Sequence, residues 1–190
     1  SQAKENTLEL EVGDLLKGVD INFIENILQN GSVAKEFLGA GASSDSTPFD
    51  TDVSRVPAED LSEGFGGAVS NSLAAGYGEI LFCVKNRGQF ELTEQNKPAK
   101  YKPKKLELFS TGGGRHYGVR TGFPTTEIDF MIAKDSLLEN KRKFNKICYE
   151  IAQNGWYIPI VDTSGKLIFT SELYEEYKKI FEKDRALSRR

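Results

Sequence analysis

The order of strand-like and helix-like periodicity along the chain is the feature that most restricts its fold. Apolar runs and period-two alternation predict strands, and apolar residues three and four positions apart predict helices. Strands are expected at 8–12, 79–85, 89–93, 106–109, 127–132, 157–161 and 166–169, and helices at 20–31, 136–154 and 171–183. These elements do not follow a repeating strand–helix–strand rhythm. We therefore expect an α+β fold with a mixed or antiparallel sheet and three main helices, rather than a doubly wound parallel sheet.

Length and composition predict a single domain. A chain of 190 residues is of ordinary domain size, so residues 1–190 are taken as one unit. Its hydrophobic fraction of 38% and charged fraction of 28% are typical of a soluble globular protein. No apolar stretch reaches the length of about 18 residues that a membrane span requires. The polar stretch 39–67 is expected to be a long functional loop inside the domain.

Charge and cysteine content restrict the partners. A net charge of −3 argues against nucleic acid as an obligatory partner, and the basic clusters at 97–105 and 141–143 are expected to be solvated surface. Cys83 and Cys148 lie far apart in apolar contexts, so we expect both to be reduced core residues. Reduced cysteines suit a cytoplasmic protein, and a secreted effector is also compatible with the sequence.

The segment 110–132 carries the residues best suited to chemistry. Glu127 and Asp129 are two positions apart, which on a strand places both carboxylates on one face. The glycine-rich loop before them offers backbone amides for a phosphate, and Arg115, His116 and Arg120 add positive charge. His116 is also the single histidine, and therefore a candidate acid or base.

Two short patterns earlier in the chain, taken with 126–129, resemble the ADP-ribosyltransferase superfamily, which splits NAD and transfers ADP-ribose. The runs 15–19 and 27–31 are similar to the family's opening strand and helix, although Lys17 stands where the family has His or Arg. The segment 70–72, followed by the strand 79–85, is similar to its Ser-Thr-Ser strand region. The segment 126–129 would then supply the catalytic glutamate. The resemblance spans most of residues 8–132.

This resemblance implies a transferase that uses NAD as substrate. Glu127 would be the catalytic carboxylate, holding a ribose hydroxyl and stabilising an oxocarbenium-like transition state. The acceptor would be an unknown protein or small molecule, as in a bacterial effector or toxin domain. The residues assigned to substrate or cofactor binding are Lys17, Gly18, Ser70, Ser72, Arg115, His116 and Arg120.

Two alternatives remain open. A Gly-Gly turn at 113–114 followed by Glu127 and Asp129 is similar to the nucleotidyltransferase pattern, in which paired carboxylates bind magnesium and Asp162 would be the third ligand. A non-catalytic interaction domain would instead use the 39–67 loop and the 157–169 hairpin as contact surfaces. The NAD hypothesis requires Glu127 to line a cleft with Lys17 and 70–72, and the metal hypothesis requires Glu127, Asp129 and Asp162 to converge.

Overall fold

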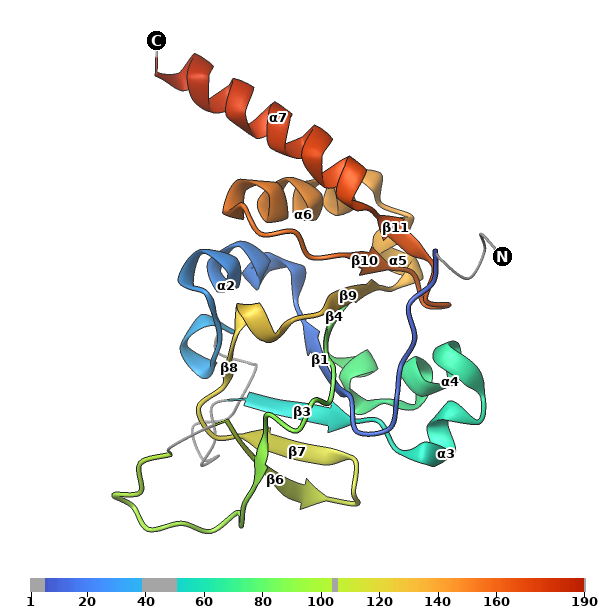
Figure 1. The fold of residues 1–190 in the computed structure, drawn as a ribbon, viewed down its shortest axis with the longest axis vertical. Helices are drawn as coiled ribbons and strands as arrows, with labels where there is room; N and C mark the ends of the chain where they lie inside the picture. The colour runs from blue at the N-terminus through green and yellow to red at the C-terminus, as the bar shows by residue number, and fades with distance from the viewer. Residues whose placement is uncertain (1–5, 39–50, 104–105, 190) are drawn as a thin grey trace.

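The computed structural model describes residues 6–38, 51–103 and 106–189 (Figure 1). The predicted α+β class is confirmed, because one mixed nine-stranded sheet is covered by helices. The strand order of this sheet is β11-β10-β9-β4-β1-β3-β7-β6-β5, and β2 and β8 form a separate pair. No helix in the described ranges is long and apolar enough to cross a membrane.

The strands and helices are short except near the C-terminus. The strands are β1 (Leu15–Val19), β2 (Ser32–Val33), β3 (Thr51–Arg55), β4 (Ile80–Val84), β5 (Glu91–Leu92), β6 (Glu107–Gly112), β7 (His116–Val119), β8 (Phe123–Pro124), β9 (Phe130–Ala133), β10 (Ile160–Val161) and β11 (Leu167–Phe169). The α-helices are α2 (Ile24–Asn30), α3 (Ala58–Leu61), α4 (Gly64–Asn71), α5 (Asp135–Leu138), α6 (Lys141–Asn154) and α7 (Ser171–Ser188). The 3-10 helices are η1 (Ile21–Phe23), η2 (Lys35–Phe37), η3 (Leu73–Gly76) and η4 (Thr125–Glu127).

The sheet has a hydrophobic core on each face. On one face, α2 and α6 contribute Ile27 and Ile151 to a large cluster that contains Val19 of β1. On the other face, Val69 of α4 packs in a second cluster with Leu16 of β1. Strand β1 is therefore buried from both sides, which explains why its sequence is an almost continuous apolar run.

The polar stretch 39–67 differs from the expected loop. Residues 39–50 lie outside the described ranges, but the remainder forms β3, α3 and the start of α4. Strand β3 pairs with both β1 and β7, so it is an interior strand of the sheet. The domain accordingly has a fourth substantial helix, α4, besides the three that periodicity predicts.

Two predicted strand assignments are wrong. Residues 8–12 form no ladder, although Leu8 N–H donates to the Gly165 carbonyl at 2.8 Å. The segment 89–93 does not return beside β4. It contributes β5, which pairs in parallel with β6 at the far edge of the sheet. The glycine in Asn86-Arg87-Gly88 favours a turn, but the turn alone did not determine the pairing partner.

The glycine-rich segment 110–122 forms a hairpin rather than an open loop. Strands β6 and β7 pair antiparallel through it, with Gly112 opposite His116. Gly113 and Gly114 have φ values of +63° and +71°. Two successive positive φ values are those of a type I′ turn, which glycine adopts without strain. The glycines therefore have a structural explanation that needs no phosphate.

The two cysteines are free and buried, as expected from their apolar contexts. Burial raises the pKa of the Cys83 thiol well above 9.0, and it raises that of Cys148 to about 12. Both thiols are consequently protonated and unreactive at neutral pH, so they are core residues rather than nucleophiles.

Glu150 is a buried carboxylate between α6 and α2. Glu150 is 6% exposed, and its Oε2 atom has no hydrogen-bond partner among the described residues. Burial raises the pKa of Glu150 from 4.5 to about 7; Lys146, 3.9 Å away, opposes this shift, and Glu25 adds to it. A carboxyl group with a raised folded-state pKa stabilises the fold below its unfolded pKa, and this contribution is lost as the pH rises to the folded value.

We therefore expect Glu150→Gln to leave stability nearly unchanged at pH 4.5 and to raise the free energy of unfolding at pH 8 by about 1–3 kcal/mol. Urea unfolding of both proteins across this pH range measures the difference. Glu139→Gln, at an exposed position, is the control and should show no such pH dependence. An equal effect of Glu150→Gln at both pH values would contradict the prediction.

Candidate functional site

A gap between strands β1 and β3 forms the candidate site. The two strands pair only at Leu15↔Arg55 and Leu16↔Ser54, although β1 continues to Val19. Antiparallel strands alternate the residues whose backbone groups point toward a given neighbour. Since β1 bonds to β3 at Leu16, the N–H and C=O of Gly18 point toward the gap. Gly18, which lines the cavity at this gap, is therefore a candidate for backbone hydrogen bonding to a ligand.

Lys17 places a buried positive charge at this gap. The residue is 6% exposed, and its Nζ atom donates to Asp52 Oδ1 of β3 at 2.9 Å. A lysine in an apolar strand would cost considerable free energy without a partner, and Asp52 supplies one. The Asp52 side chain is 35% exposed and lines a narrow crevice beside Lys17.

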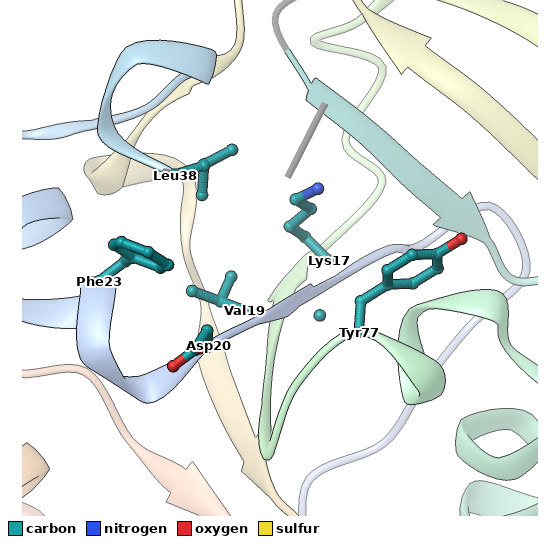
Figure 2. Close-up of a pocket in the computed structure, with 7 residues that line it drawn as sticks. Lys17, Val19, Asp20, Phe23, Leu38 and Tyr77 are labelled. Carbon is teal, nitrogen blue, oxygen red and sulfur yellow. The ribbon is translucent and has the colours of Figure 1, made fainter. Parts of the chain in front are cut away.

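The cleft holds a cavity of about 230 Å³. Figure 2 shows Phe23 and Tyr77 on opposite sides of Lys17 and Val19, with Leu38 beside Phe23. The cavity is lined by Lys17, Gly18, Val19, Asp20, Phe23, Leu38 and Tyr77. Two aromatic rings beside one ion pair suit a flat, partly polar ligand.

Helix η3 covers Gly18 and carries the chain into Tyr77. A Cβ atom on Gly18 would lie 2.1 Å from the Ala74 carbonyl oxygen, so only glycine permits this approach. A narrow crevice adjoins the cavity, shares Lys17, Gly18 and Tyr77 with it, and reaches His116 of β7. The crevice brings the imidazole to the same cleft as the ion pair.

Three of the predicted binding residues, Lys17, Gly18 and His116, meet in this cleft. The two serines have other roles. Ser70 lies on α4, where its hydroxyl donates to the Gly67 carbonyl at 3.3 Å. The Ser72 hydroxyl donates to the Val69 carbonyl at 2.7 Å. The segment 70–72 is thus the end of a helix and not the strand that the family resemblance implied.

The two predicted arginines make structural contacts. Arg115 donates to Asp60 at 2.5 Å and to Glu59 at 3.1 Å, which ties the β6–β7 hairpin to α3. The hydrogen bond that Arg115 donates to Asp60, followed by the attraction of both carboxylates, raises the pKa of Arg115. Arg120 lies 4.4 Å from the Phe109 ring centre and donates to the Glu94 carbonyl at 2.8 Å.

Glu127 lies apart from the lining of the cleft. It belongs to η4 rather than to a strand, because Pro124 begins a helical turn that ends before β9. Its Oε2 atom accepts from Gln89 Nε2 at 3.1 Å. Asp129 accepts from Lys85 N–H at 2.7 Å and from the Arg87 guanidinium. The hydrogen bond from Arg87 to Asp129 raises the pKa of Arg87. Glu127 therefore does not line a cleft with Lys17 and 70–72, so the NAD hypothesis fails in the form that uses Glu127 as its carboxylate.

The three carboxylates of the magnesium hypothesis do not converge. Asp162 Oδ1 accepts from the backbone N–H groups of Ser164 and Lys166 at 2.9 and 3.0 Å in the β10–β11 turn. Burial alone would raise the pKa of Asp162, but the hydrogen bonds from Ser164 and Lys166 lower it overall. Across the described ranges, no group of three or more His, Cys, Asp and Glu side chains is placed to hold a metal ion.

Asp52, Phe23 and Tyr77 are functional candidates that sequence reasoning missed. Asp52 belongs to β3, which has few aliphatic residues and lies in a polar stretch. Tyr77 is 60% exposed and follows η3, so no periodic pattern marks it. A usable signal was present at Lys17, because a charge inside the apolar run 15–19 requires an acidic partner.

Comparison of the chain with protein-family models, curated proteins and solved structures finds no match.

Proposed function

We propose that the cleft between β1 and β3 binds NAD and that the domain transfers its ADP-ribose group to an acceptor. One observation carries this proposal. The pairing of β1 with β3 stops at Leu16↔Ser54, which leaves the Gly18 backbone facing a cavity beside the Lys17–Asp52 ion pair. The partial sequence resemblance to ADP-ribosyltransferases at 15–19 supports the same assignment of β1.

The nicotinamide end of NAD fits the cavity best. A volume of about 230 Å³ is below the usual 300–1,000 Å³ of whole-ligand pockets, so only one end of a dinucleotide enters. The Gly18 N–H and C=O match the carbonyl and amine of a primary carboxamide. Phe23 and Tyr77 offer apolar surface to the ring. The adenosine end would extend over the surface beyond Tyr77.

Asp52 takes the part that the sequence assigned to Glu127. Cleavage breaks the bond between the ribose C1′ and the nicotinamide nitrogen, and nicotinamide leaves with the bonding electrons. The ribose acquires oxocarbenium character, which a nearby carboxylate stabilises. Asp52 is the accessible carboxylate at Lys17, and Lys17 holds its Oδ1 atom in place. The acceptor then bonds to C1′ and releases its proton to a base, for which His116 in the lining of the crevice is the candidate.

Binding is tested separately from chemistry. Calorimetric titration with NAD, nicotinamide and ADP-ribose shows which end of the dinucleotide binds. We expect NAD and nicotinamide to bind to the protein and Lys17→Met to weaken NAD binding by about tenfold or more. Absence of NAD binding to the wild-type protein at millimolar concentration would refute the proposal.

Catalysis is tested by replacing each of the two candidate carboxylates, Asp52 and Glu127, with its amide. We expect Asp52→Asn to reduce the rate of nicotinamide release by about 100-fold or more, because the amide cannot offset the developing positive charge. Glu127→Gln is the matched control and should keep the wild-type rate, since Glu127 lies at Gln89 and away from the cleft lining. Nicotinamide release is measured chromatographically, and thermal melting verifies that both variants fold. A loss confined to Glu127→Gln would reverse the assignment.

A further inference from the structure

Helix α7 packs on the molecule along one side only. Tyr174 is buried, the Phe181 ring meets the Tyr149 ring of α6 edge-on at 6.0 Å, and the Tyr177 hydroxyl donates to Asn145 Oδ1 at 2.8 Å. The last two contacts are with α6, and the Tyr174 ring lies 5.4 Å from the Tyr157 ring before β10. Figure 1 shows α7 crossing α6 and continuing beyond it at its C-terminal end. An 18-residue helix thus has one supported side and a long free side.

An exposed apolar stripe runs along α7 beside the side that contacts α6, since Asp184, which accepts from the Tyr149 hydroxyl of α6, is only one turn from Ile180. Leu173, Ile180 and Leu187 are 36%, 50% and 53% exposed and follow one another at intervals of seven residues. Seven residues are almost two helical turns, so the three side chains form a line along the helix. Aliphatic side chains repeated every seven residues along one line can form a row of a helix–helix contact.

We propose that this stripe binds the same stripe of a second copy of the chain, with the two α7 helices antiparallel. The stripe is centred on Ile180, with Leu173 and Leu187 equally far on either side. A twofold axis at Ile180 therefore pairs Ile180 with Ile180 of the second copy. It also pairs Leu173 of each copy with Leu187 of the other. Such an isologous contact closes on itself as a dimer.

Charge favours the antiparallel arrangement. Glu176 and Lys183 flank the stripe on the same side of the helix, at the positions between its apolar residues. Both are exposed, and neither makes an ion pair with another residue in the described part of the chain. In the antiparallel dimer Glu176 lies opposite Lys183 of the second copy, and the twofold axis repeats the pair. In a parallel pair the two flanking positions would lie on opposite sides of the contact, and Glu176 would not meet Lys183 of the second copy.

The predicted dimer is weak. A single helix pair buries less surface than the roughly 1,200–2,000 Å² of stable interfaces. We therefore expect association at micromolar to millimolar concentration, seen by sedimentation equilibrium as a mass that rises from monomer to dimer. The full chain is used, without added ligand, so the result does not depend on NAD binding.

Substitution within the stripe tests the contact. We expect Ile180→Glu to weaken dimerisation at least tenfold, because it places two like charges at the twofold axis. Arg185→Glu is the matched control and should dimerise like the wild type, since it lies about 140° around the helix from Ile180. Both positions are exposed, so both variants should melt like the wild type.

Charge exchange tests the orientation. Glu176→Lys and Lys183→Glu should each weaken the dimer, and the double variant should restore it to within about threefold of wild type. A protein that stays monomeric at all concentrations would overturn the proposal. So would a dimer that Ile180→Glu leaves unchanged, and a double variant without recovery would overturn the antiparallel arrangement.

Discussion

Replacing Asp14 by alanine is expected to lower the free energy of unfolding by about 3–5 kcal/mol, the largest effect of any single substitution considered for this fold. Asp14 is 0% exposed and lies at the start of β1. Its Oδ2 atom accepts from Lys85 Nζ at 2.5 Å and from Glu11 N–H at 2.7 Å. Its Oδ1 atom accepts from Asn86 N–H at 2.9 Å.

The cost arises from the groups that alanine leaves behind. Lys85 would keep a partly buried charge with only the Glu9 carbonyl at 3.1 Å and the Glu11 carboxylate at 3.9 Å. The backbone N–H groups of Asn86 and Glu11 would also lose their acceptor. Asp14 also joins the N-terminal segment to the end of β4, so its loss would release both from β1.

Urea unfolding of Asp14→Ala, Asp14→Asn and Asp135→Ala measures this contribution. Asparagine keeps the shape and one acceptor oxygen, so we expect a smaller loss of about 1–3 kcal/mol. Asp135 is exposed in the first turn of α5, and its replacement should change stability by no more than about 1 kcal/mol. Equal effects of Asp14→Ala and Asp135→Ala would show that the buried network contributes nothing.

The elements that could be predicted from the sequence are those whose own apolar pattern indicates which residues are buried. β4 and β9 are apolar runs, and α6 and α7 have regular apolar faces. Strand β1 was indicated only by the resemblance of 15–19 to a family's opening strand, because its lysine and glycine interrupt the apolar run. Strand β3 could not be predicted, because Thr51-Asp52-Val53-Ser54-Arg55 becomes a strand through its neighbours β1 and β7. Its pairing is a long-range contact that local periodicity does not encode.

Only the part of the candidate site that stands out in the local sequence could be predicted. Lys17, Gly18 and His116 are distinctive in their local sequence. Asp52, by contrast, reaches the cleft only because β3 lies beside β1. Glu127 was misplaced because the period-two argument assumed a strand, whereas the turn after Pro124 is a 3-10 helix. A spacing argument for paired carboxylates holds only when the secondary structure beneath it is correct.

Replacing Gly18 by alanine is expected to have the second large effect. It tests the geometry of the cleft separately from the stability of the rest of the fold. The new Cβ atom would lie 2.1 Å from the Ala74 oxygen and 3.0 Å from the Tyr77 Cβ atom. The first of these contacts is with backbone, which cannot turn aside as a flexible side chain could. Helix η3 must therefore move away from β1, and Tyr77 moves with it.

We expect Gly18→Ala to lower the free energy of unfolding by about 1–3 kcal/mol, the usual range for an overpacked site. It should also weaken NAD binding by tenfold or more, because the displaced Tyr77 no longer forms its wall of the cavity. Chemical unfolding and calorimetric titration of the same protein measure the two effects.

Gly76→Ala is the matched control, because Gly76 lies in η3, the helix that covers Gly18, and a Cβ atom on Gly76 meets nothing within 4 Å. It should keep both the stability and the NAD affinity of the wild type. If Gly18→Ala lost stability and still bound NAD normally, η3 would be a structural cover and Tyr77 would have no part in binding. If Gly18→Ala changed neither property, the close approach of η3 to β1 would not exist in solution. Comparing Gly18 of β1 with Gly76 of η3 therefore tests the geometry of the cleft independently of the identity of the acceptor.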